Sequence, residues 1–144
     1  MVEIVLFGQF IEVNEGVDKM ATRCMVAKKV KNGYKAIYIH WDGYPEKPGV
    51  GWRLRKDYKS PAKVDKLIAL GSLSSISEEI GRKHSFDSPT PGWSVAYHRD
   101  RGESWRQNKP EMFRTLDDLM DSASSRWANY LYVYEKGKWK TYSL

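Results

Sequence analysis

Apolar and polar residues alternate with a period of two in three segments, at residues 22–41, 93–100 and 127–144. Strand side chains point to the two faces of a sheet in turn, so this period predicts half-buried strands. The first segment contains Asn32-Gly33, which is typical of a type I′ turn, and the last contains Lys136-Gly137. The pattern therefore predicts two hairpins with a single strand between them.

Two further segments show helical spacing. Ser60-Pro61 offers a capping side chain and then a proline at the first helical position, with apolar residues following at 64, 67 and 68. Thr115 caps the second helix, and residues 42–51 and 72–92 are loops rich in Gly, Pro and Ser. The predicted fold is α+β, an antiparallel sheet with two main helices, near 61–70 and 115–125, packed on one face.

One domain accounts for most of the chain. We see no repeat or linker in the 144 residues, and we predict a single domain over residues 20–144. Residues 1–19 have two interpretations, an edge strand at 2–7 or an extension before an internal start at Met20. The single cysteine, Cys24, excludes an intramolecular disulfide and a cysteine-based zinc site. No apolar run reaches the roughly 20 residues of a membrane span.

The net charge of +6 favours phosphate-bearing partners. The charged residues are spread along the chain without a polybasic block, so the charge permits DNA binding without requiring it. Arg53, Arg55 and Lys56 form a small cationic cluster that is typical of a solvated surface. An acidic DNA mimic is disfavoured.

Histidine and aspartate recur in two stretches, "YIHWDGYP" (38–45) and "AYHRDRGE" (96–103). Alternation places these histidines and aspartates on the face opposite the aliphatic core, together with a stripe formed by Tyr130, Tyr132 and Tyr134. An exposed aromatic face is typical of an interface or a ligand site. The tyrosine stripe has three interpretations, a second packing layer, an oligomer interface or a stacking platform for bases. Among the assemblies we expect a homo-oligomer, most simply a two-fold dimer.

The loops at the ends of strands 34–41 and 93–100 are the predicted ligand site. Guanidinium groups bind phosphate and aromatic rings stack on bases, so this combination favours a nucleotide-type anion. Arg99 or Arg101 is expected to hold the phosphate, and Trp41 or Tyr44 the base. The predicted ligand-binding residues are His40, Trp41, Asp42, Tyr44, His84, His98, Arg99, Asp100 and Arg101.

The two His-x-Asp pairs have a second interpretation as ligands of a divalent metal. Their spacing matches no known metal motif, and aspartates at such positions usually cap turns. We therefore predict no metal site and no cofactor. The sequence leaves open whether the protein is an enzyme.

The strings "ATRCMV", "HWDGYP", "LGSLSS", "HSFD", "AYHRDRGE" and "YVYEKGKW" resemble those of small uncharacterised proteins encoded mostly by bacteriophages and prophages. The resemblance covers about residues 20–144 and assigns no catalytic residue. It implies a phage accessory protein in the host bacterial cytoplasm, with no membrane association, and a candidate anti-defence role. The expected function is binding of the nucleotide-type ligand. The alternatives are a metal-dependent nucleotide hydrolase or nuclease, and an inhibitor that binds a host defence protein directly.

Overall fold

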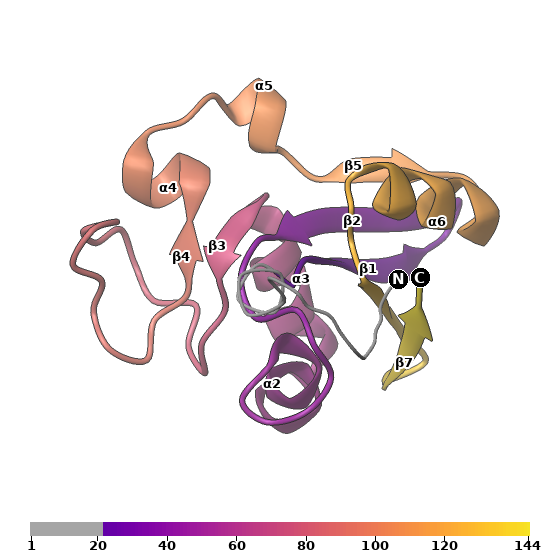
Figure 1. Ribbon diagram of the computed structural model, residues 1–144, viewed down its shortest axis with the longest axis horizontal. Helices are drawn as coiled ribbons and strands as arrows, with labels where there is room; N and C mark the ends of the chain where they lie inside the picture. The colour runs from indigo at the N-terminus through magenta and orange to yellow at the C-terminus, as the bar shows by residue number, and fades with distance from the viewer. Residues whose placement is uncertain (1–21) are drawn as a thin grey trace, which may run out of the picture.

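The computed structural model describes residues 22–144, so the predictions for residues 1–19 lie outside the described residues. The fold is α+β, as predicted, but the sheet is mixed rather than purely antiparallel. Its strand order is β4-β3-β2-β1-β6-β7, and β5 also pairs with β2. The parallel pairs are β1 with β6 and β2 with β3. Figure 1 shows the arrangement of these elements.

The strands are β1 (Cys24–Val30), β2 (Gly33–Ile39), β3 (Leu73–Ser75), β4 (Val95–Ala96), β5 (Glu111–Phe113), β6 (Tyr130–Glu135) and β7 (Lys138–Ser143). The helices are α2 (Val50–Asp57), α3 (Pro61–Ala69), α4 (Tyr97–Arg101), α5 (Trp105–Asn108) and α6 (Leu116–Ser125). Within the described residues, no helix is long and apolar enough to cross a membrane.

Both predicted hairpins form, but their turns differ from each other. Lys136 and Gly137 have φ values of 55° and 77°, as a type I′ turn requires. In the first hairpin Gly33 already pairs with Val30 in the sheet, so the two turn residues are Lys31 and Asn32. Neither has a positive φ, and the prediction of a type I′ turn at Asn32-Gly33 is therefore wrong. A Cβ on Gly33 would lie 2.1 Å from the carbonyl oxygen of Phe113, so the close approach of β5 requires this glycine.

The two predicted helices begin where their caps indicate. The Ser60 hydroxyl accepts a hydrogen bond from the Lys63 N–H, and the Thr115 hydroxyl accepts one from the Asp118 N–H. The helix α2 was not predicted, because its N-cap is Gly49 and supplies no side-chain acceptor. The sequence signal of a helix start is therefore missing there.

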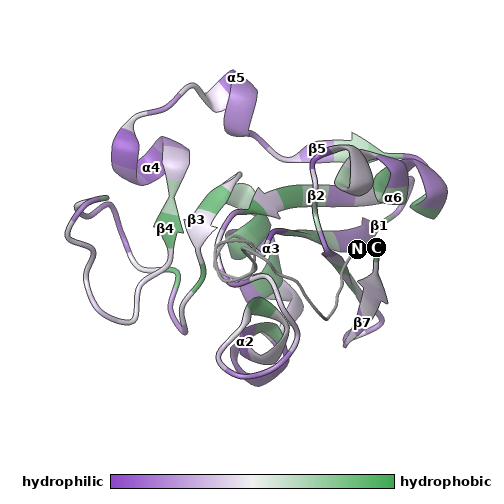
Figure 2. Cartoon of the chain, in the orientation of Figure 1, coloured by the Kyte–Doolittle hydropathy of each residue, from purple (hydrophilic) through white to green (hydrophobic). Residues whose placement is uncertain are grey.

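Helices cover both faces of the sheet, so the prediction of helices on one face is wrong. The helices α2 and α3 cover one core, which contains Ile37, Ile39 and Leu54, and α6 covers the other, which contains Leu119 and Leu131. Figure 1 shows α6 on one side of the sheet and α2 and α3 on the other. In Figure 2 the hydrophobic colouring concentrates on β1, β2 and β4, whereas α4 and α5 are mostly hydrophilic.

The tyrosine stripe of β6 lies inside the protein, contrary to the expected open face. Parallel pairing aligns Val26 with Tyr132, so the tyrosines face the core beneath α2 and α3. Tyr132 and Tyr134 are only 1% and 3% exposed, and their hydroxyls donate to the carbonyls of Gly43 and Lys59 at 2.6 Å. The homo-oligomer stays a prediction, without the exposed stripe as its support.

Candidate functional site

Asp100 is the centre of a buried polar network in the segment that was predicted as a strand. Residues 93–100 form only a two-residue strand, and α4 follows at once. The Asp100 carboxylate accepts hydrogen bonds from the N–H groups of Ala96, the N-cap residue, and His84 at 2.8 and 3.2 Å. The hydrogen bond from the N-cap N–H of Ala96 to the Asp100 carboxylate is typical of the start of a helix, and it favours a helical turn over a strand.

Arg99 uses most of its donors inside this network. Its Nε lies 2.9 Å from Asp100 Oδ1, and its terminal nitrogens donate to the carbonyls of Ile80 and Ser94. Burial would raise the pKa of Asp100, but hydrogen bonds from Arg99 and from the N–H groups of Ala96 and His84 outweigh it and lower that pKa. The geometry gives this pair a structural role, and the predicted phosphate contact of Arg99 stays a prediction.

His84 joins the same network through both ring nitrogens. Its Nδ1 accepts from the Thr90 N–H at 2.9 Å, and its Nε2 lies 3.0 Å from the Ser94 carbonyl oxygen. Because Nδ1 is an acceptor, the ring proton is on Nε2. The ring of Trp93 packs against the imidazole at 5.4 Å, so His84 anchors the loop of residues 81–92.

Arg101 and His98 lie on the outer side of α4. The Arg101 guanidinium lies 4.2 Å from the ring centroid of Phe86 and forms an ion pair with Glu103. His98 Nδ1 is 2.7 Å from the Glu103 carbonyl oxygen, and its ring packs against Trp105. These contacts hold the turn that follows α4.

The first stretch lies at the end of β2. His40 Nδ1 is 2.9 Å from the Tyr38 hydroxyl, and Trp41 packs edge-on against the His40 ring. Asp42 has a positive φ of 60°, and its carbonyl accepts from Val50 at the start of α2. The Tyr44 carbonyl likewise accepts from the N–H of Gly51, so these two loop residues anchor α2.

The two His-x-Asp pairs do not form a common ligand set. In residues 22–144, no three His, Cys, Asp or Glu side chains gather closely enough to hold a metal ion. Asp100 is already surrounded by the hydrogen bonds of Arg99, Ala96 and His84. These contacts fit the interpretation of Asp100 as a cap.

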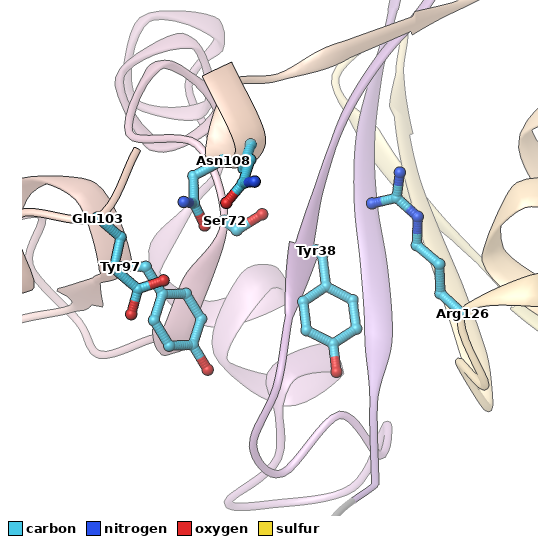
Figure 3. Close-up of a pocket in the computed structure, with 7 residues that line it drawn as sticks. Tyr38, Ser72, Tyr97, Glu103, Asn108 and Arg126 are labelled. Carbon is cyan, nitrogen blue, oxygen red and sulfur yellow. The ribbon is translucent and has the colours of Figure 1, made fainter. Parts of the chain in front are cut away.

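A pocket of about 310 Å³ lies beside the second stretch, and none of the nine predicted residues lines it. Figure 3 shows Tyr38 between Tyr97, Glu103 and Asn108 on one side and Arg126 on the other. The lining residues are Tyr38, Ser72, Tyr97, Glu103, Gln107, Asn108 and Arg126. The available sequence signal was a tyrosine within two residues before each His-x-Asp pair, Tyr38 before His40 and Tyr97 before His98.

Strand pairing explains why the pocket exists. The outer edge of β2 is shared by two strands, because β5 pairs with residues 34–36 and β3 pairs with Ile39. Tyr38 lies between these two pairings. Its side chain is on the same face of β2 as Tyr34 and Ala36, which α6 covers, but Tyr38 itself is outside the part of β2 that packs against α6. The α4–α5 segment closes the other side, where the Ser72 N–H donates to the Asn108 carbonyl at 2.8 Å.

The two pocket tyrosines stay protonated at neutral pH. Burial raises the pKa of Tyr38, and the charge and hydrogen bond of Arg23 only partly offset this rise. Burial also raises the pKa of Tyr97, and a hydrogen bond with Ser74 only partly offsets it. The Arg23 charge favours the ionised form of both phenols and so acts against these rises in pKa. Burial and Arg23 both lower the pKa of the neighbouring His40.

Arg126 and Glu103 bring opposite charges to the pocket. Arg126 pairs with Glu111 outside the pocket lining, and Glu103 pairs with Arg101. The pocket therefore combines hydroxyl, amide, guanidinium and carboxylate groups with two aromatic rings, which suits a polar ligand that carries a planar group.

No protein-family model, curated protein or solved structure matches this chain.

Proposed function

We propose that the protein binds a small anionic ligand of the nucleotide type in the pocket between Tyr38 and Tyr97. One observation carries the proposal: two tyrosines from different elements and an arginine line a cavity of about 310 Å³. Small-molecule sites usually have volumes of about 300–1,000 Å³, so this cavity suits a mononucleotide-sized ligand.

Each part of such a ligand has a complementary group. The tyrosine rings offer flat surfaces for a base, and stacking of one base on an aromatic ring contributes about 1–3 kcal/mol. Arg126, with Arg23 near the tyrosine hydroxyls, supplies positive charge for a phosphate. The side chains of Glu103, Gln107 and Asn108 suit the amino and carbonyl groups of a base edge.

The available groups favour binding over catalysis. The described residues contain no set of three metal ligands, so no observation on this part of the chain supports the alternative of a metal-dependent hydrolase. The Cys24 thiol is buried in the core, and burial raises its pKa, so it is not a nucleophile at the pocket. Raised pKa values likewise keep the pocket tyrosines as hydrogen-bond donors.

The biological setting of the proposal comes from the sequence resemblance alone. It supports a phage accessory protein in the host bacterial cytoplasm that counters a defence system by sequestering a nucleotide signal. Direct binding to a host defence protein is the second candidate, and Trp127 favours it, because this side chain is 76% exposed. Exposed tryptophans are enriched at the centres of protein interfaces.

Calorimetric titration with linear and cyclic nucleotides tests the proposal. We expect at least one nucleotide to bind, with affinity falling about tenfold or more in Tyr97→Leu, where the stacking surface is lost. Arg126→Ala should weaken binding to a similar extent, whereas Arg114→Ala, which removes the same charge from an exposed residue outside the pocket, should not. Absence of binding by every nucleotide, or equal binding by all three variants, would refute it.

A further inference from the structure

Residues 47–66 form one of two strongly basic segments of the chain. They contain seven Lys and Arg against two Asp, a surplus of five, and residues 22–41 have the same surplus, with five Lys and Arg and no Asp or Glu. The segment of residues 47–66 forms α2 and α3 and the turn between them. Both helices pack against the same core beneath one face of the sheet (Figure 1).

The apolar side chains of both helices point into the core, so the outer surface is left to the cations. Val50 and Leu54 of α2 and Val64, Leu67 and Ile68 of α3 are buried. Lys56, Lys59 and Lys66 are exposed, and within residues 22–144 none of them has a carboxylate partner. Both acids of the segment form ion pairs, Asp57 with Arg53 inside the segment and Asp65 with Lys28 of β1.

Trp52 gathers three of the cations. Lys47, Arg53 and Lys56 lie 5.3, 4.6 and 5.0 Å from the centroid of its ring. Like charges repel, and the electron-rich face of the indole offsets this repulsion, together with the Asp57 carboxylate that pairs with Arg53. This arrangement presents several cations side by side on the outside of α2.

We propose that the α2–α3 surface, defined as residues 47–66, binds the phosphate backbone of a nucleic acid. A polyanion with closely spaced phosphates is the partner that suits a cluster of cations, such as the one around Trp52, and phosphate contacts need no base recognition. A membrane surface fits less well, because insertion requires exposed apolar side chains. The large exposed hydrophobic residues of the described chain are Trp41, Trp105, Met112, Trp127 and Leu144, all outside this surface.

This site is separate from the nucleotide pocket. None of residues 47–66 lines that pocket, which lies on the opposite face of the sheet beside α6. The two proposals therefore succeed or fail independently.

Fluorescence anisotropy with a labelled duplex DNA and a labelled single-stranded RNA tests the proposal, with and without anionic phospholipid vesicles as competitor. The test protein is the full chain with Lys56→Gln, Lys59→Gln and Lys66→Gln. The control carries Lys31→Gln, Lys83→Gln and Lys109→Gln, which are exposed lysines elsewhere and remove the same net charge. Circular dichroism confirms that both proteins are folded.

We expect the wild type to bind at least one of the two nucleic acids, with affinity falling steeply between about 50 and 200 mM salt. The test variant should bind at least tenfold more weakly, and the slope of log K against log salt should become shallower by about 2–3, because three phosphate contacts are lost. The control should keep the wild-type slope. Equal losses in both variants, no binding to either nucleic acid, or release of the nucleic acid by vesicles at equal phosphate concentration would overturn the proposal.

Discussion

The hydroxyl of Tyr38 lies 2.9 Å from Nδ1 of His40, on the same face of the chain at the end of β2. Burial raises the pKa of this phenol, and the charge and hydrogen bond of Arg23 act against that rise. The contact with His40, which does not line the pocket, fixes the orientation of one of the two rings that flank the pocket.

This relationship predicts the titration of His40. Burial and the Arg23 charge lower its pKa, so His40 should titrate below its ordinary value in an NMR pH titration of the imidazole protons. Arg23→Gln should move that pKa upward, toward the ordinary value of about 6.5. A His40 pKa at or above the ordinary value, or one that Arg23→Gln leaves unchanged, would contradict this contact.

Asp100 should contribute more to stability than any exposed carboxylate. Its side chain is 0% exposed and is bonded to Arg99 and two backbone N–H groups. Asp100→Ala leaves these donors unpaired, so we expect the free energy of unfolding to fall by about 3 kcal/mol. Urea denaturation measures this loss, and Asp121→Ala, at an exposed position on α6, should change it by less than about 0.5 kcal/mol. Equal effects of the two variants would show that the network is not stabilising.

The same carboxylate predicts acid sensitivity. Its folded-state pKa lies below the ordinary value, so its contribution is complete above the unfolded-state pKa of about 3.9. The contribution is lost as the pH falls from that value through the folded-state pKa. Urea denaturation at about pH 6 and pH 3 should therefore show a smaller decrease in stability for Asp100→Asn than for the wild type. A decrease of the same size in both proteins would contradict the assignment.

Trp127 follows the C-cap of α6 in a left-handed conformation, with φ of 64°. This conformation costs a residue with a Cβ about 1–2 kcal/mol, and glycine avoids most of that cost. We expect Trp127→Gly to raise the free energy of unfolding by about 1 kcal/mol, since the exposed ring loses little packing. Trp41→Gly is the matched control, because Trp41 has a negative φ and should gain nothing. Loss of stability in Trp127→Gly would show that the ring makes a stabilising contact.

Local signals predicted the elements that local chemistry determines. Ser60 and Thr115 cap their helices through side-chain acceptors, so both helices were found. The α2 helix lacks such an acceptor, and its stability comes from burying Val50 and Leu54 against the sheet, which no local pattern reveals. The face of the β6 tyrosines depends on its parallel pairing with β1, which joins segments about a hundred residues apart.

The candidate site shows the same division between local and long-range information. Sequence spacing drew attention to the His-x-Asp stretches, and the pocket lies beside them. His98 and Asp100 of the second stretch bind the backbone of their own segment, as His84 does in its loop, whereas His40 of the first stretch contacts the Tyr38 hydroxyl. The lining residues come from β2, the residue before β3, α4 and the loop after it, α5 and the C-cap of α6, and only the sheet topology brings them together.

NMR chemical-shift mapping of the full chain against a panel of mononucleotides tests the central claim most directly, because it reports both binding and its location. The account predicts concentration-dependent shifts that concentrate on Tyr38, Ser72, Tyr97, Asn108 and Arg126 and that Tyr97→Leu suppresses. Shifts confined to the α2–α3 surface, or no shifts with any nucleotide at millimolar concentration, would contradict it.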